Sequence, residues 1–334
     1  MLKLNLNNTL RKLDKLADDL LNRLSLRQRE VLIKRFSLKG KKYTLEEIGR
    51  EWGVTRERVR QVEAQALDKI KPIISEKDFA QVDSYLDQVG GLYRDDLLMK
   101  EFEFYSNNVN ASKLRFLFQV RGKPYFFKEN QDFYSFWYLS PEIKQKAFNQ
   151  IKAFLKFFSS NKKDILERKT YISRIKDWLT INCLSISKHF GINSFGDFGL
   201  TSWPEINPKR IRDRSYLVLK KVNRPLHFQE INNLVNYYFG ENKSSPQTVH
   251  NELIRDSRFV LVGRGIYALE EHGYRKGTLK ELIVEILKKY QTMPAEKIVK
   301  LVKKQRLFQE SSIILNLRDR KLFKKLDNNK YTLA

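Results

Sequence analysis

The sequence of 334 residues is poor in the residues that build disulfides, metal sites and membrane spans. Cys183 is its only cysteine, which excludes an internal disulfide and a zinc finger. The four histidines do not have the spacing of metal ligands: His189, His227, His250 and His272. No apolar run reaches the roughly 18 residues of a membrane span, and no signal-peptide pattern occurs. We therefore expect a cytoplasmic protein without a metal or other cofactor.

Motifs of catalysis are also missing. His189 lies near Ser185 and Ser187, but there are no elbow glycines and no acidic residue at a diagnostic distance, so a core or surface histidine is the simpler interpretation. Asp95 and Asp96 stand at the start of an expected helix, where carboxylates stabilise the helix dipole. Gly263-Arg264-Gly265 is too short to cradle phosphates. We expect no enzyme.

Acidic residues are scarce relative to basic ones. There are 64 Lys and Arg against 39 Asp and Glu, a net charge of +25. Residues 1–72 hold 18 basic and 10 acidic residues, and residues 276–334 hold 15 and 6, whereas residues 73–207 are nearly balanced with 19 and 16. Such an excess indicates a polyanionic partner, nucleic acid or an acidic membrane surface, and the two ends of the chain are its expected contact regions.

Residues 44–66 show the pattern of a helix-turn-helix. Thr44 and Glu47 have the spacing of a capping box that begins a helix. Gly53 stands where the chain must turn sharply, and Thr55 can cap the next helix. In that second helix Val59, Val62 and Ala66 recur at helical spacing as one apolar stripe. The pattern therefore predicts two short helices joined by a tight turn.

The opposite side of the second helix is polar. At about 100° per residue, Glu57, Arg60 and Gln61 point away from the apolar stripe, with Arg56 and Arg58 beside them. Arg pairs with guanine edges, Gln with adenine, and Glu accepts a hydrogen bond from the cytosine amino group. A helix of this kind suits the major groove of DNA.

These residues, together with Leu24 to Leu32 and Arg35-Phe36, resemble region 4 of the sigma-70 family, which reads the promoter −35 element. The resemblance covers about residues 8–72. It implies that Arg56, Glu57 and Gln61 contact bases. It implies backbone or flanking DNA contacts for Arg27, Arg35, Thr44, Arg58 and Arg60. Nothing in the chain resembles region 2, the promoter-melting region, so we expect a regulator rather than a working sigma factor.

The middle of the chain is expected to be mainly helical. Helices are predicted around 9–23, 76–88, 92–102, 111–120, 141–158 and 164–180, with a small helix-turn-helix around 184–190. Gly90-Gly91 is interpreted as a linker. Aromatic strands at 125–127 and 133–137 flank a polar turn and predict a wing. Stacking on single-stranded bases is the alternative role for these rings, and core packing of about half of them is favoured.

Residues 208–334 contain an internal repeat. Ile254 to Phe259 is echoed by Leu317 to Phe323, and Tyr267-Ala268-Leu269 by Tyr331-Thr332-Leu333. Each copy predicts three helices followed by a two-stranded wing, with turns at 263–265 and 327–330. The simpler alternative is a small helical domain with a hairpin. Arg264 and Lys330 are the candidate contact residues of the two wings.

The first copy carries a second resemblance. Arg212 to Tyr216, Arg224 to Ile231 and Phe259 to Leu269 resemble a HARE-HTH domain over about residues 208–272. This winged helix-turn-helix is a DNA-associated or polymerase-associated module that also occurs in the delta subunit of bacterial RNA polymerase. The resemblance transfers no base-reading residues.

We expect a mainly α chain of tandem helix-turn-helix and winged-helix modules with small β-wings. The expected modules are a sigma region 4-like module at 1–72, a linker helix and winged-helix-like module at 73–140, a helical module at 141–207, and winged helices at 208–275 and 276–334. The expected function is sequence-specific binding of double-stranded DNA in transcription, at the nucleoid and in association with RNA polymerase. The alternatives are a delta-like auxiliary polymerase subunit that acts mainly through protein contacts, and the DNA-targeting subunit of a restriction or modification system.

Overall fold

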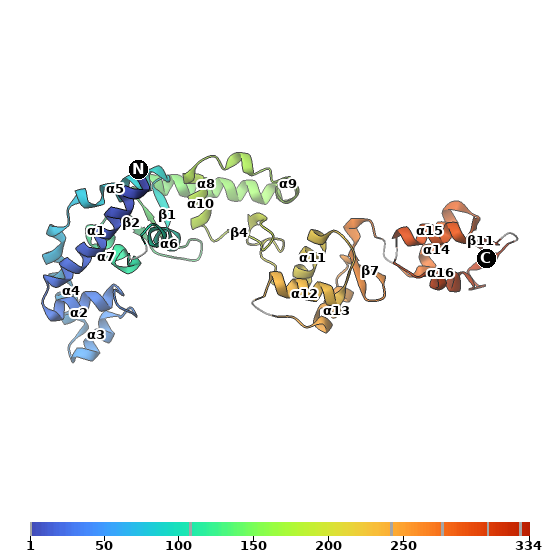
Figure 1. Ribbon diagram of the computed structural model, residues 1–334, viewed down its shortest axis with the longest axis horizontal. Coiled ribbons are helices and arrows are strands. Elements are labelled where there is room, and N and C mark those ends of the chain that lie inside the picture. The colour runs from blue at the N-terminus through green and yellow to red at the C-terminus, as the bar shows by residue number, and fades with distance from the viewer. Residues whose placement is uncertain (1, 107–108, 241–242, 275–276, 306, 327–328) are drawn as a thin grey trace. The chain divides into compact units, whose positions relative to one another are not determined.

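The computed structural model describes residues 2–106, 109–240, 243–274, 277–305, 307–326 and 329–334. It is mainly helical with small antiparallel sheets, as expected, and it divides into two compact units at residues 1–191 and 192–334. Figure 1 traces the elements along the chain.

The first unit begins with four helices and continues with a helical and sheet-containing part. The helices are α1 (Leu2–Asn22), α2 (Leu26–Arg35), α3 (Leu45–Trp52), α4 (Arg56–Ile70), α5 (Ala80–Gln88), α6 (Asp95–Tyr105), α7 (Ala111–Arg121), α8 (Pro141–Ser160), α9 (Lys162–Arg168) and α10 (Trp178–Ile186). Its strands are β1 (Leu92–Arg94), β2 (Tyr125–Phe127) and β3 (Phe136–Tyr138). A two-stranded sheet of β4 (Phe190–Ile192) and β5 (Phe198–Leu200) follows at the start of the second unit.

Elements α5 to β3 follow the order of a winged helix. One helix precedes a short strand, two more helices follow, and two strands complete a sheet in the order β1-β3-β2. Helix α1 packs on α5, α6 and α7 of this module. Leu10, Leu13 and Leu20 of α1 share a buried cluster with Phe102 and Trp137. The long first helix is therefore part of the core of the following module.

The expected helix at 92–102 is wrong in its first turn, and the expected linker at Gly90-Gly91 is wrong. Both glycines have positive φ, +93° and +72°, and they turn the chain from α5 into β1. Leu92 pairs with Tyr138, and Arg94 pairs with Phe136. A Cβ on Gly90 would lie 2.7 Å from the backbone of Leu179, so this turn is tightly packed against α10.

Two further helical expectations are wrong. A single helix at 164–180 does not form, because Lys169 takes a left-handed conformation (φ 50°) that ends α9. Asp177 begins α10 by accepting a hydrogen bond from the backbone N–H of Thr180 at 2.7 Å. The small helix-turn-helix expected at 184–190 is absent, because α10 continues to Ile186 and β4 starts at Phe190.

The aromatic strands are buried unequally. Phe136 and Trp137 of the central strand β3 are both fully buried, because the sheet is covered on both faces. Trp137 packs edge-on against Phe118 of α7, and Phe127 and Phe133 contact Phe148 of α8. Core packing therefore accounts for the central strand, whereas Tyr125 and Phe126 of the outer strand β2 are exposed and the other rings are half-buried.

The second unit contains the repeat, and its two copies have the same element order. The first copy comprises α11 (Ile211–Val222), β6 (Leu226–His227), α12 (Phe228–Tyr238), α13 (Pro246–Arg255), β7 (Phe259–Gly263) and β8 (Ile266–Leu269). The second comprises α14 (Leu279–Tyr290), β9 (Met293–Pro294), α15 (Ala295–Gln305), α16 (Glu310–Leu317), β10 (Phe323–Lys325) and β11 (Lys330–Leu333).

The sheet orders are β6-β8-β7 and β9-β11-β10, the arrangement already seen for β1-β3-β2. The three helices and the wing expected for each copy are confirmed, and the short strands β6 and β9 are additional. His227 precedes α12, and its Nδ1 accepts a hydrogen bond from the N–H of Gln229. Part of the second expected turn, residues 327–328, lies outside the described residues.

Candidate nucleic-acid interface

Helices α2, α3 and α4 form a three-helix module around a small core. Val31, Ile48 and Val59, one from each helix, are fully buried in its centre. Helix α2 begins with a capping box in which Ser25 and Gln28 exchange hydrogen bonds. The residue spacing of this box is visible in the sequence, but it was not among the sequence-based predictions.

The predicted start of α3 is confirmed. The Thr44 N–H donates to Oε2 of Glu47 at 2.7 Å, and the Glu47 N–H donates to Oγ1 of Thr44 at 3.2 Å. The hydrogen bond from the Thr44 backbone holds the pKa of Glu47 below its usual value. This exchange satisfies two N–H groups that have no partner within the helix, and it fixes the point at which α3 begins.

The turn between α3 and α4 depends on two glycines. Gly53 ends α3 in the left-handed conformation with φ 65°, which a residue with a side chain rarely adopts. The N–H of Val54 then donates to the carbonyl of Gly49 at 2.9 Å. A Cβ on Gly49 would lie 2.7 Å from the carbonyl oxygen of Val54, so the backbone of the turn packs closely against α3 here.

Helix α4 has the two faces that the sequence predicts. Thr55 caps it by accepting a hydrogen bond from the N–H of Arg58 at 3.2 Å. Val59 and Ala66 are buried, and Val62 is partly buried against the same core. The side chains on the other face are all exposed: Arg56, Glu57, Arg58, Arg60 and Gln61. The module therefore presents five polar side chains to solvent from the first two turns of one helix.

Two pairs connect these polar side chains. Arg60 donates to both carboxylate oxygens of Glu57, from Nε at 2.8 Å and from Nη2 at 2.7 Å. The hydrogen bond from Arg60 lowers the pKa of Glu57 and raises that of Arg60. Arg58 donates from Nη1 to Oε1 of Gln61 at 3.2 Å. Because these pairs are solvent-exposed, they are weak and can be exchanged for contacts with a ligand.

The arginines expected at phosphates differ in their surroundings. Arg27 is exposed, with its guanidinium carbon 5.9 Å from the ring centre of Trp52. Arg35 is partly buried between helices. Its Nε donates to Oε1 of Glu63 in α4 at 3.1 Å, and its Nη1 donates to the carbonyl of Tyr43 at 3.0 Å. Arg35 therefore joins α2 to α4 and to the start of α3.

Further basic residues surround this face. Lys39, Lys41 and Lys42 are exposed in the loop between α2 and α3, and Arg50 is exposed on α3. Lys41 lies 3.6 Å from a carboxylate oxygen of Glu47. The predictions from the sequence did not include these residues, although the basic run in the loop is a signal that could have identified them.

The two predicted wing residues lie in the second unit. Arg264 is exposed at the turn between β7 and β8, next to Gly265 with φ 69°. Lys330 is exposed at the start of β11. Each is therefore available to solvent at the edge of its own small sheet.

The described part of the chain gives little support for a metal site, for a functional role of Asp95 or for a membrane span. No group of three or more His, Cys, Asp or Glu side chains there could hold a metal ion. Asp95 is buried and accepts hydrogen bonds from Trp137 at 2.7 Å and from Arg115 at 3.0 Å, which gives it a structural role. Among the helices described, none combines the length and apolar character needed to cross a membrane.

Comparison with known proteins identifies this module. Residues 20–71 match the family described as Sigma-70, region 4. The chain is 53% identical over 55 residues to the RNA polymerase sigma factor SigA of Listeria monocytogenes, and 51% identical over 55 residues to SigA of a Bacillus species. With SigA of Clostridium acetobutylicum it shares 53% identity over 53 residues.

These matches cover about one sixth of the chain. In the Listeria relative they cover 16% of this chain and 15% of that protein. The family match begins at residue 20, later than the expected residue 8, and the preceding part of α1 packs on α5, α6 and α7. Residues 20–71 therefore form a sigma-70 region 4 module, a non-enzymatic unit that binds DNA.

Proposed function

We propose that this protein is a transcription regulator that binds promoter-type elements in double-stranded DNA through α4 and associates with RNA polymerase at the nucleoid in the cytoplasm. The observation that carries this proposal is the exposed polar face of α4 within a module that matches sigma-70 region 4. The net charge of +25 supports a polyanionic partner.

Base reading is assigned to Arg56, Glu57 and Gln61. All three are exposed in the first two turns of α4, where side chains of a helix in the major groove reach base edges. Arg56 forms no hydrogen bond or ion pair with the described residues, so its guanidinium is available to a guanine. Glu57 is held by Arg60 in the free protein, and DNA binding exchanges or retains that pair.

Positioning on the DNA backbone is assigned to the surrounding arginines. Arg27, Arg58 and Arg60 are exposed and can approach phosphates, and Thr44 lies exposed at the start of α3. Arg35 contributes mainly by holding α4 in place through Glu63, and a phosphate contact is assigned to the donors of its guanidinium that these hydrogen bonds leave over. Such contacts set the register of the protein without reading sequence.

The three modules with a winged-helix element order differ at their third helix, the one that would enter a groove. Helix α7 packs on α1, and Gln119 is its only exposed residue. Helix α16 exposes Leu315, and its first turn carries the acidic Glu310. Helix α13 also exposes an apolar residue, Ile254, but beside it lies a larger set of exposed polar side chains: Gln247, Thr248, Asn251 and Arg255.

We therefore assign additional DNA contacts to α13 and to Arg264 of the adjacent wing. Gln and Asn side chains make paired hydrogen bonds with adenine, and Gln247 and Asn251 lie on one face of α13, 3.1 Å apart between Nε2 and Oδ1. The resemblance of residues 208–272 to HARE-HTH domains supports a DNA-associated role. Lys330 is the corresponding wing contact proposed for the second copy.

The experiment is selection of binding sites from random duplex DNA by the full chain. We expect an enriched consensus, which changes or relaxes when Glu57 is replaced by Ala. Glu103→Ala is a matched control, because Glu103 is an exposed acidic residue of α6 outside the module. An identical consensus for the chain and for Glu57→Ala would refute base reading by α4. The absence of any DNA binding by the full chain would favour a delta-like subunit that acts through protein contacts.

A further inference from the structure

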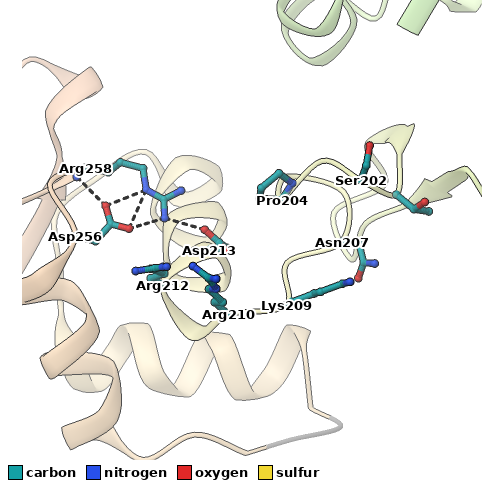
Figure 2. Close-up of a pocket in the computed structure, with 10 residues that line it drawn as sticks. Ser202, Pro204, Asn207, Lys209, Arg210, Arg212, Asp213, Asp256 and Arg258 are labelled. Carbon is teal, nitrogen blue, oxygen red and sulfur yellow. Dashed lines mark hydrogen bonds and ion pairs between the residues drawn. The ribbon is translucent and has the colours of Figure 1, made fainter. Parts of the chain in front are cut away.

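A pocket of about 490 Å³ lies beside the start of α11 in the second unit. One wall comes from the segment that precedes α11, and the other comes from α11 and from the residues just before β7. The lining residues are Thr201, Ser202, Pro204, Asn207, Lys209, Arg210, Arg212, Asp213, Asp256 and Arg258, drawn in Figure 2. A volume of this size is typical of sites for small ligands.

The two carboxylates of the pocket are already committed to Arg258. Its Nη2 lies 2.8 Å from Oδ1 of Asp213 and 2.6 Å from Oδ2 of Asp256, and its Nε lies 3.0 Å from Oδ1 of Asp256 (Figure 2). This cluster links α11 to the start of the wing. Arg258 is therefore a structural cation, and its charge is balanced within the protein.

The other three cations of the pocket lack hydrogen-bonded partners of this kind, although Arg212 also interacts electrostatically with Asp256. Lys209, Arg210 and Arg212 form no hydrogen bond or ion pair with the described residues. Lys209 and Arg210 are exposed, and Arg212 is partly buried. The four cations and two carboxylates of the lining leave a net charge of +2. Unpaired cations gathered in a concave site repel one another unless an anion is bound between them.

Backbone polarity adds to this positive potential. Arg210 is the N-cap residue of α11, and no side-chain hydrogen bond caps the helix there. The first N–H groups of a helix carry a partial positive charge and attract anions. Ser202 and Asn207 supply further polar groups to the wall, whereas the lining includes no aromatic ring on which a nucleobase could stack.

The second copy of the repeat differs at the same position. Asp319 corresponds to Asp256 in the repeated sequence, and Lys280 stands in the first turn of α14 where Arg212 stands in α11. Lys280 forms an ion pair with Asp319 at 2.5 Å. The cation of the second copy is thus paired within the protein, whereas Asp256 makes its hydrogen bonds to Arg258 and Arg212 forms no such close pair.

We propose that this pocket binds a phosphate group through Lys209, Arg210, Arg212 and the start of α11. Arginine and lysine form strong charge-assisted hydrogen bonds with phosphate oxygens, and the lining favours the phosphate over any attached base. The phosphate belongs either to the DNA backbone or to a free phosphorylated small molecule. The proposal does not rest on base reading by α4, which belongs to the other unit.

The test uses the full chain with two probes, inorganic tripolyphosphate and a non-specific DNA duplex. The pocket variant is Lys209→Gln/Arg210→Gln, which changes two exposed side chains. The control variant, Lys288→Gln/Lys300→Gln, removes two exposed lysines of α14 and α15 and gives the same change in net charge. Tripolyphosphate affinity is measured by calorimetry, and duplex affinity is measured at several salt concentrations.

We expect the pocket variant to bind tripolyphosphate about tenfold more weakly than the unaltered chain, and the control variant to stay within about twofold of it. If the phosphate is that of DNA, the slope of log K against log salt also falls by about 1.8 in the pocket variant alone. An unchanged slope identifies a free phosphorylated molecule as the source. Equal behaviour of the two variants with both probes would overturn the proposal. Glu57→Ala, which tests α4, is expected to leave tripolyphosphate affinity unchanged.

Discussion

Glu57 and Arg60 form a two-hydrogen-bond ion pair on the exposed face of α4, with distances of 2.8 and 2.7 Å. One member of the pair is assigned to bases and the other to phosphates. The pair therefore favours one orientation of the carboxylate before DNA binds, and because it is exposed to solvent this preference is weak.

A double-mutant cycle on DNA affinity tests this coupling. We expect Glu57→Ala to weaken binding to the preferred site by about 5- to 150-fold, the range of a paired base contact. We expect the double variant with Arg60→Ala to bind more tightly than the product of the two single effects predicts, because each single change also breaks the shared pair. Strictly multiplicative effects would show that the pair is irrelevant in the complex.

Arg35 is expected to affect both stability and binding. Arg35→Ala removes the hydrogen bonds to Glu63 and to the Tyr43 carbonyl, and it is expected to lower the free energy of unfolding of the module by about 1–2 kcal/mol. Arg35→Ala is also expected to weaken binding to all DNA sequences about equally. Glu63→Gln separates the two effects, since it disturbs the ion pair but keeps the Arg35 charge. Thermal unfolding and duplex titration measure the two variants, and a change of consensus in Arg35→Ala would contradict its assignment to the backbone.

Salt is expected to weaken DNA binding steeply. With six to ten phosphates engaged, affinity is expected to fall by about 10³–10⁵ between roughly 50 and 200 mM salt, because counterions return to the DNA. Titration of one duplex at several salt concentrations gives the slope. A flat dependence would exclude the electrostatic interface proposed for this basic chain.

The only thiol is expected to be inert in the folded protein. Cys183 is buried, and burial raises the pKa of its thiol to about 12. At pH 8 it stays protonated, and the reactive thiolate is absent until the pH approaches 12 or the unit unfolds. A thiol reagent such as dithionitrobenzoate is expected to label one group in guanidinium chloride and none without it. Rapid labelling of the folded chain would contradict the packing of α10.

Transcription assays distinguish a regulator from a factor that initiates transcription. Added alone to core RNA polymerase on a linear promoter, the protein is expected to give no specific transcript, because nothing in the sequence resembles the promoter-melting region of sigma factors. Added to holoenzyme, it is expected to change output only from templates that carry its site. Removal of residues 209–334 is expected to alter that change while the part of the site preference that is set by α4 is retained. Specific initiation with core polymerase alone would make the chain a divergent sigma factor.

Local interactions explain which features of the fold and of the candidate site could be predicted from the sequence. Thr44 and Glu47, Gly53 and Thr55 act through hydrogen bonds and backbone angles within about four residues, so their spacing alone predicts the turn and both helix starts. The exposed face of α4 follows from helical periodicity in the same way. The duplicated modules were visible because similar segments recur with the same element order.

The features that could not be predicted from the sequence depend on contacts between residues that are distant in the sequence. Leu92 to Arg94 becomes a strand because Phe136 to Tyr138 pairs with it, a partner more than 40 residues away. Arg35 forms an ion pair with Glu63, α1 packs on α7, and Arg258 forms an ion pair with Asp256. The sequence determined by itself where a DNA-reading helix begins and which side chains it exposes. Only the tertiary structure decided which helices are covered and which charges stay unpaired, because these depend on packing between segments whose separation in sequence carries no periodic signal.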